Sequence, residues 1–184
     1  MPSTKFRKVD ERSIHRSSLL HFVEGTFEGP DGQRFDRDLV RHPGAVVVVP
    51  YDDKTRDVVF VRQYRAPLDM ELLEVPAGKR DVAGEPNEVT AARELAEETG
   101  LAAGRWEQIA HFYNSPGFSD EESWCFLARD LYEVPGSRHG IEEQHMTVER
   151  HSMAEVTHLV RSGDITDAKT IVGLLLAQVV LGEG

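Results

Sequence analysis

The sequence contains almost no cysteine and no long run of apolar residues. Cys125 is the only cysteine, so no internal disulfide can form. No stretch reaches the roughly 18 apolar residues that a membrane span requires, and the charged N-terminus lacks the apolar segment of a secretion signal. From these absences we expect a cytoplasmic protein with no membrane partner.

Basic residues are scarce relative to acidic ones. The chain has 21 lysines and arginines against 32 aspartates and glutamates, which gives a formal net charge of −11. Such a chain offers no basic footprint for a polyanionic strand, so we expect no nucleic acid partner. A small phosphorylated substrate would need a metal ion or local arginines to offset its charge. The eight histidines have no paired cysteine or histidine at zinc-like spacing.

The chain is long enough to bury the core of one domain, since 40% of its 184 residues are hydrophobic. Apolar runs at 45–49 and 58–61, separated by a polar turn, indicate buried central strands. Before them, Asp31-Gly32 lies between two alternating segments, which is typical of a β-hairpin. We therefore expect a β-hairpin extension over residues 1–40, which serves dimerisation, and a main domain over residues 41–184.

Strands and helices alternate along the rest of the chain. A helix is expected over 86–99, with Pro86 in its first turn and Gly100 as its stop. Apolar residues spaced by three and four predict core-facing helices at 153–161 and 167–181. Further strands are expected at 72–75, 106–112, 123–128 and 146–151. This order predicts an α/β (α+β) fold in which a mixed sheet lies between helices.

Three glutamates of the 86–99 helix share one side of it. With Glu94 as the zero of a helical wheel at about 100° per residue, Glu97 and Glu98 complete an arc of about 100°. Four aliphatic residues point the other way, namely Val89, Ala92, Leu95 and Ala96. We expect one core face and one acidic face. The acidic face is unfavourable for the helix, because like charges repel at these spacings and the last turn prefers cations.

The three glutamates allow two interpretations. A solvated acidic face is the ordinary fate of such a group. The alternative is a site for a hard divalent ion, Mg²⁺ above all, which accepts oxygen ligands and shares its coordination with waters and phosphate. The absence of nearby cysteine and histidine argues against zinc. Spacing alone leaves both interpretations open.

A longer motif surrounds these glutamates. Gly78, Glu85 and the segment Arg93 to Leu101 resemble the Nudix box, written G-x5-E-x7-R-E-U-x-E-E-x-G-U with U an aliphatic residue. Six residues rather than five separate Gly78 from Glu85, which is a one-residue loop insertion, and the spacing from Glu85 onward is intact. The resemblance implies a Nudix-type α/β/α sandwich with a mixed central sheet and favours the metal site.

The resemblance extends over roughly residues 40 to 180. Segments 61–65, 73–78 and 115–121 look like those that mark ADP-ribose pyrophosphatases. That subfamily has a proline about fifteen residues past the box, and Pro116 lies fifteen residues after Leu101. The resemblance implies hydrolysis of the pyrophosphate of ADP-ribose to AMP and ribose 5-phosphate by a metal-activated water, with Mg²⁺ as cofactor and Mn²⁺ as a substitute.

The same resemblance assigns the metal ligands. Glu94 and Glu98 would be the main ligands, with Glu97 assisting and the backbone carbonyl of Ala77 completing the set. Arg93 would orient the glutamate carboxylates. Its simpler interpretation is a surface i,i+4 partner of Glu97, worth a few tenths of a kcal/mol.

Substrate-binding residues follow from the resemblance as well. Arg65 would hold the diphosphate, since its fork of donors suits phosphate oxygens, unless it is only a surface charge at a strand end. Arg62 and Glu74 belong to the same set of segments. Gly117 and Phe118 would approach the terminal ribose.

The resemblance also implies a general base on a mobile loop before a late strand. The segment 139–145 occupies that place, and Glu142 is favoured over Glu143 by its distance from the strand start. His145 is an alternative base, and both glutamates could be ordinary acids of an exposed loop.

The alternatives for the whole protein are a hydrolase of another nucleoside diphosphate sugar, such as ADP-glucose or GDP-mannose, and a non-catalytic ADP-ribose-binding module. A homodimer is expected from the family.

Overall fold

The computed structural model describes residues 5–18, 20–137 and 141–183. The chain divides into two compact units. The first unit comprises Met1–Gly44 and Tyr113–Glu122, and the second comprises Ala45–Phe112 and Ser123–Gly184. The first unit therefore combines the N-terminal segment with a short insertion from the middle of the chain.

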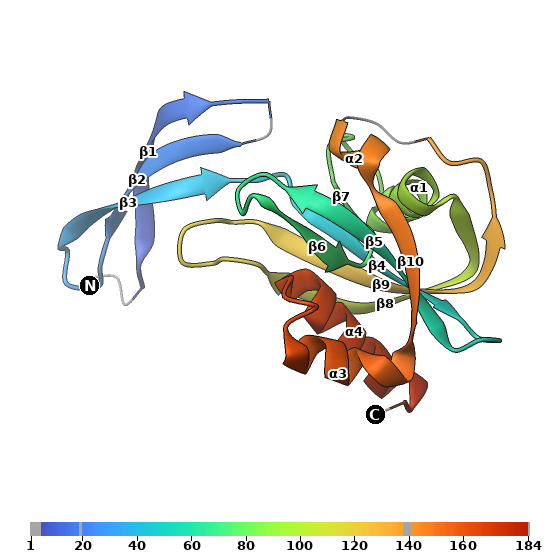
Figure 1. The fold of residues 1–184 in the computed structure, drawn as a ribbon. Helices are drawn as coiled ribbons and strands as arrows, with labels where there is room; N and C mark the ends of the chain where they lie inside the picture. Colours follow the sequence, from blue (N-terminus) through green and yellow to red (C-terminus); the bar gives the residue numbers. More distant parts are fainter. Residues whose placement is uncertain (1–4, 19, 138–140, 184) are drawn as a thin grey trace. The chain divides into compact units, whose positions relative to one another are not determined.

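The first unit is built on a three-stranded antiparallel sheet, β1 (Arg7–Arg16), β2 (His21–Glu28) and β3 (Arg34–Arg41), in that order (Figure 1). The expected hairpin is β2–β3, and Gly32 in its turn has a φ of 80°. Strand β1 is an addition to that hairpin. Its sequence shows no apolar alternation because most of its side chains are charged or polar and exposed.

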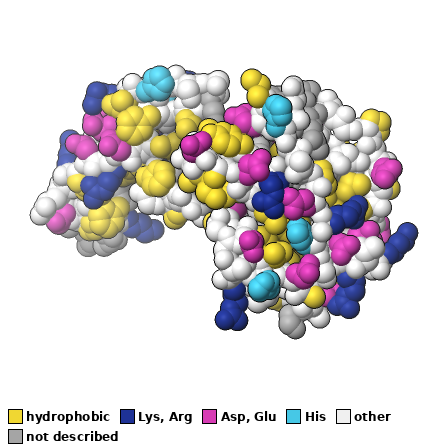
Figure 2. Space-filling model, viewed as in Figure 1, with side chains coloured by type: hydrophobic (Ala, Val, Ile, Leu, Met, Phe, Trp, Pro, Cys, Tyr) yellow, Lys and Arg dark blue, Asp and Glu magenta, His cyan; other side chains and the backbone are white. Residues whose placement is uncertain are grey.

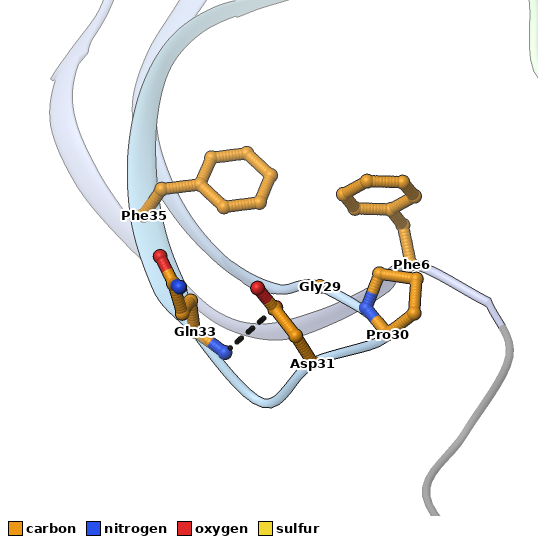
Figure 3. A pocket seen from close by; sticks show the side chains of 6 residues that line it. All are labelled: Phe6, Gly29, Pro30, Asp31, Gln33 and Phe35. Atoms are coloured by element: carbon orange, nitrogen blue, oxygen red, sulfur yellow. Dashed lines mark hydrogen bonds between the residues drawn. The ribbon is translucent and has the colours of Figure 1, made fainter.

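An aromatic cluster lies beside the turn between β2 and β3. The rings of Phe27 and Phe35 stack with centroids 5.7 Å apart, and Phe6 meets Phe35 edge-on at 6.1 Å. Phe6, Phe35 and four turn residues line a shallow pocket (Figure 3). Asp31 closes the turn by accepting a hydrogen bond from the backbone N–H of Gln33 at 3.1 Å. The six lining residues include none of the predicted site residues.

The second unit contains a seven-stranded sheet in which the path β10-β5-β4-β9-β8 is extended by β6 on β5 and β7 on β4 (Figure 1). β4 pairs with β9 in parallel and with β5 and β7 antiparallel, so the sheet is mixed, as predicted. The strands are β4 (Ala45–Asp52), β5 (Asp57–Arg65), β6 (Met70–Glu74), β7 (Ala77–Lys79), β8 (Leu101–Tyr113), β9 (Glu122–Glu133) and β10 (Thr147–Ser152).

Helices cover both faces of this sheet. The helices are α1 (Asn87–Thr99), α2 (Ile141–His145), the short 3-10 turn η1 (Met153–Glu155), α3 (Val156–Ser162) and α4 (Ala168–Leu181). Val46 and Val48 of β4 pack with Leu95 of α1, whereas Val47 and Val49 pack with α3 and α4 on the opposite face. The run at 45–49 is continuously apolar because both of its faces are buried. The predicted α/β/α arrangement is confirmed.

Charged side chains are interspersed over the surface. On the face shown in Figure 2, lysines and arginines lie singly among aspartates and glutamates. Several form ion pairs, including Arg129 with Asp53 and Arg56 with Glu183. Within the described part of the chain, no helix is long and apolar enough to cross a membrane.

Candidate active site

Helix α1 begins and ends where the sequence predicts. Pro86 occupies the N-cap position, and Gly100 ends the helix in the left-handed conformation with a φ of 70°. The predicted division into a core face and an acidic face is wrong in part, because Glu94 and Glu98 are buried beside Leu95, whereas Val89 is 51% exposed. The acidic side of α1 and its core-facing side therefore overlap, because strand β7 packs against both sides.

Gly78 in β7 lies directly beneath the Glu94 carboxyl group. A Cβ atom built on Gly78 would lie 1.9 Å from Cδ of Glu94, a distance that no side chain can tolerate. Gly78 pairs with Val46 of β4 and so has a fixed place in the sheet. The first specified position of the box is therefore glycine because a carboxyl group occupies the volume of its side chain.

Glu98 is held by the residue before Gly78. The backbone N–H of Ala77 donates a hydrogen bond to Oε2 of Glu98 at 3.2 Å, and Glu98 is only 4% exposed. Glu94 and Glu98 thus contact consecutive residues of β7, as i and i+4 residues of one helix can. The structure brings together three of the predicted metal-site residues, Ala77, Glu94 and Glu98.

Arg93 lies among four carboxylates. Its guanidinium group donates to Glu94 at 2.9 Å and to Glu97 at 3.1 Å, and it lies 3.5 Å from both Asp81 and Glu85. The i,i+4 pairing with Glu97 is real, but it is one of four. Arg93 therefore restrains acids from α1 and from the preceding loop, and its role in orienting metal ligands stays a prediction.

The carboxylates fit a hard divalent cation. Glu94 is 9% exposed, and its burial raises the pKa of its carboxyl group to about 7 although the neighbouring Arg93 lowers it, so a cation would offset the remaining cost of the buried charge. Mg²⁺ keeps several waters and needs few protein oxygens, which these two buried glutamates supply. Among the described side chains, no three of the His, Cys, Asp and Glu type converge on a common point.

We predict that cation binding tightens with rising pH. The pKa of Glu94 rises from 4.5 to about 7 in the folded protein, so below that pH a cation must displace a proton. The association constant for Mn²⁺ should rise by about tenfold per pH unit up to pH 7 and then level off. Titration calorimetry between pH 5.5 and 8.5 measures this slope.

The variant Glu94→Gln serves as the control and should show no such slope. The folding free energy provides a second check. Because the folded pKa exceeds the unfolded one, this carboxyl group stabilises the metal-free protein most fully below pH 4.5 and loses that effect as pH rises through 7. A pH-independent Mn²⁺ affinity would contradict the prediction.

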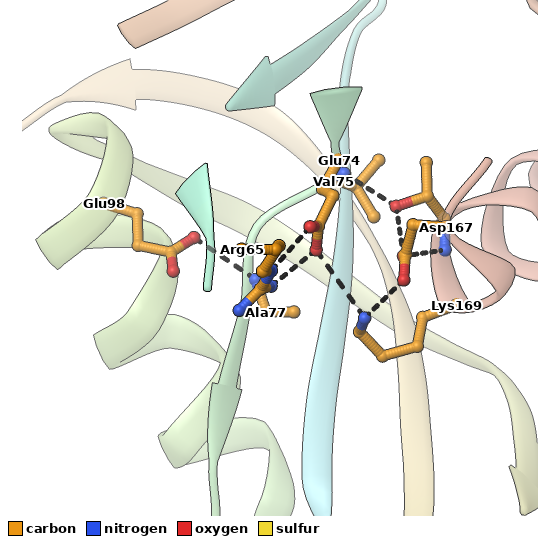
Figure 4. A network of polar contacts seen from close by, with 8 residues as sticks. Arg65, Glu74, Val75, Ala77, Glu98, Asp167 and Lys169 are labelled. Carbon is orange, nitrogen blue, oxygen red and sulfur yellow. Dashed lines mark hydrogen bonds and ion pairs between the residues drawn. The ribbon is translucent and has the colours of Figure 1, made fainter. Parts of the chain in front are cut away.

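Beside this site, a polar network links strands β5 and β6 to the start of α4 (Figure 4). Arg65 donates two hydrogen bonds to Glu74, at 2.7 and 2.6 Å, and Lys169 lies 3.6 Å from the same carboxylate. Lys169 also pairs with Asp167 at 2.6 Å. Asp167 in turn caps α4 by accepting a hydrogen bond from the backbone N–H of Thr170. Glu74 is 1% exposed, so it supports Arg65 and presents almost no surface to a ligand.

Removing the Glu74 charge should destabilise the fold. We expect Glu74→Gln to lower the free energy of unfolding by about 2 kcal/mol, less than for a fully buried pair because Arg65 is partly exposed. Glu149→Gln is the matched control, since Glu149 forms the same two-bond pair with Arg62 but is 28% exposed. It should cost less than about 1 kcal/mol. Urea unfolding measures both, and equal losses would refute a role for burial.

The other predicted substrate residues are placed as follows. Arg62 is engaged by Glu149, which His151 also contacts at 3.1 Å. Gly117 and Phe118 belong to the first unit, where the carbonyl oxygen of Phe118 accepts a hydrogen bond from Val40 N–H at 2.8 Å. The Phe118 side chain is 56% exposed.

The segment expected to carry the general base forms a short helix rather than a loop. Its first two residues, 139 and 140, lie outside the described residues, and α2 follows from Ile141 to His145. Glu142 and His145 are exposed on it, and the Glu143 side chain lies outside the described part of the chain. Helix α2 could not be predicted, because a five-residue helix has no periodicity to detect.

Fold and site together define an α/β/α domain with a carboxylate site built on one helix and the strand beneath it. A comparison with known families finds a NUDIX domain over residues 40–171. The chain therefore belongs to the Nudix family, whose hydrolases depend on a divalent metal.

Proteins with similar sequence or structure match this chain over nearly its full length. The chain is 36% identical over 170 residues to an ADP-ribose pyrophosphatase of Bacillus subtilis (strain 168), covering 92% of this chain and 91% of the relative. It is 37% identical over 182 residues to an ADP-ribose pyrophosphatase of Mycobacterium tuberculosis (strain ATCC 25618 / H37Rv), covering 98% and 86%. The crystal structure of an ADP compounds hydrolase matches with a TM-score of 0.83 and 25% identity, covering 98% of this chain and 96% of that one.

Proposed function

We propose that the protein hydrolyses the pyrophosphate bond of ADP-ribose to AMP and ribose 5-phosphate. The observation that carries this proposal is the placement of Glu94 and Glu98 on the backbone of β7, with Gly78 leaving room for the first of them. A module that only binds ADP-ribose has no need for these buried, charged side chains. The names of the two relatives support ADP-ribose as the substrate.

The chain's own residues would divide the work as follows. Glu94 and Glu98 hold the cation, Glu97 assists, and Arg93 keeps the carboxylates in place. Arg65, oriented by Glu74, donates to the diphosphate. When bound, Mg²⁺, or Mn²⁺ in its place, neutralises the diphosphate and activates the attacking water. Dimerisation through residues 1–40 remains our proposal for the N-terminal extension.

Glu142 is the proposed general base. Replacing it with glutamine removes the proton acceptor but none of the proposed metal ligands, so kcat should fall by about 100-fold or more while Mn²⁺ affinity is unchanged. Steady-state kinetics and titration calorimetry measure the two quantities. A Glu142→Gln variant with full activity would show that the base lies elsewhere.

A substrate panel tests the proposed function. The protein is incubated with ADP-ribose, ADP-glucose, GDP-mannose and a dinucleotide in the presence of Mg²⁺ or Mn²⁺, and the products are separated by chromatography. We expect the highest kcat/KM for ADP-ribose. A clear preference for GDP-mannose would refute the choice of ADP-ribose, and no turnover of any compound would refute the enzyme assignment.

A further inference from the structure

Arg80 lies on the same face of the sheet as the carboxylate site. Arg80 directly follows β7, and in extended chain Gly78 and Arg80 project to the same side because one residue, Lys79, separates them. Gly78 pairs with Val46, and Val46 pairs with Trp124 of β9, so these three form a row whose side-chain positions share one face. The Glu94 carboxyl group lies on that face, directly over Gly78. Trp124 is two strands away, about 10 Å at the usual strand spacing.

Trp124 is enclosed on both faces of its ring. The Arg80 guanidinium carbon lies 4.3 Å from the ring centroid, and the His111 ring stacks on Trp124 at 4.8 Å with an interplanar angle of 16°. Two planar groups at such distances cannot share one face of the ring, so they lie on opposite faces. Trp124 therefore has no face left to stack on a base. It holds the Arg80 guanidinium through a cation–π contact.

The charge of Arg80 is not compensated. Within the described residues Arg80 has no ion pair or hydrogen bond, and its Nε atom is buried without a partner. The other arginines near the site differ, because Arg65 is paired with Glu74 and Arg93 contacts four carboxylates. A half-buried guanidinium without an anion is costly to desolvate. A ligand anion would supply the missing partner.

We propose that Arg80 binds a phosphate oxygen of the diphosphate handled at this site, with its guanidinium held against the Trp124 ring, on which His111 stacks. The planar fork of donors matches phosphate geometry, and Arg80 is the arginine here whose charge no carboxylate balances. The inference rests on the proposed function, since it takes the ligand to be a nucleoside diphosphate sugar. It makes Arg80 a binding residue that acts on affinity more than on the chemical step.

The experiment compares Arg80→Gln with Arg80→Lys and with the matched control Arg105→Gln. Arg105 is an arginine of β8 whose charge is paired with Asp53 and Asp130, so its loss changes the net charge equally. Two quantities are measured with Mg²⁺, the KM for ADP-ribose and the dissociation constant for methylenediphosphonate, a diphosphate mimic that is not hydrolysed. Thermal unfolding confirms that each variant is folded.

Arg80→Gln should raise both constants by about tenfold or more, as expected for a lost charge-assisted hydrogen bond, with kcat within about threefold of the parent protein. The constants of Arg80→Lys should lie between those of the parent protein and those of Arg80→Gln, and Arg105→Gln should change neither constant. Unchanged constants in Arg80→Gln, or equal losses in Arg105→Gln, would overturn the proposal. If the parent protein cleaves no nucleotide sugar, the proposed function fails by itself, and the methylenediphosphonate titration still decides the role of Arg80.

Discussion

Replacing Glu98 with glutamine should lower kcat for ADP-ribose by about 1,000-fold. Glutamine keeps the size of the side chain, and its amide oxygen can still accept the hydrogen bond from Ala77 N–H, so the fold should be retained. The negative charge is lost, however, and charge neutralisation by a metal is worth several kcal/mol of transition-state stabilisation, at about 1.4 kcal/mol per tenfold in rate. Steady-state kinetics over a range of Mg²⁺ concentrations measures the effect.

Glu88→Gln is the matched control for this experiment. Glu88 is an exposed acid in the first turn of the same helix, away from β7. Its replacement should leave kcat within about twofold of the parent protein, because exposed single charges contribute little. If Glu98→Gln retained a comparable rate, the buried pair of glutamates would not be the metal site.

The second large effect is expected from Gly78→Ala. A Cβ atom at this position would lie 1.9 Å from Cδ of Glu94, so the carboxyl group must leave its place over β7. Gly78 is not among the glycines with positive φ, so alanine is compatible with its backbone and the effect arises from the contact alone. We expect kcat to fall by about 100-fold or more, and Mn²⁺ affinity to fall by about 10- to 100-fold, as when the support of a metal ligand is lost.

Gly104→Ala tests whether this loss is specific. Gly104 lies in β8 of the same sheet, and a Cβ atom there would meet its nearest neighbour at an ordinary 3.4 Å. That variant should retain activity. Thermal unfolding of Gly78→Ala should show a folded protein, because Glu94 gains solvation when it moves. A fully active Gly78→Ala variant would mean that the carboxyl position over β7 is not needed.

The sequence predicted helices α1, α3 and α4 and the central strands because their periodicity is local and strong. The boundaries of α1 follow from Pro86 and Gly100, and β4 reads as buried on both faces. Strands β1 and β7 were missed for different reasons. The residues of β1 are mostly polar, whereas β7 has three residues and exists only through its pairing with β4, which the local sequence does not encode.

The site could be predicted as a list of residue types but not as a set of contacts. A helical wheel placed Glu94, Glu97 and Glu98 on one arc, yet it could not show that β7 lies under Glu94 and Glu98. The glycine at 78 was the available signal. The pairing of Arg65 with Glu74 depends on the register of β5 and β6. The lack of a carboxylate partner for Arg80 among the described residues can be recognised only when all residues around it in the fold are known.

The most direct test of the account follows ADP-ribose by phosphorus NMR before and after metal removal. The protein stripped with EDTA should leave the diphosphate resonances unchanged. Adding Mg²⁺ should convert them to two phosphomonoester resonances in equal amounts, those of AMP and ribose 5-phosphate. Hydrolysis that proceeds without a divalent metal, or an ADP-ribose signal that persists when Mg²⁺ is present, would contradict the proposed function.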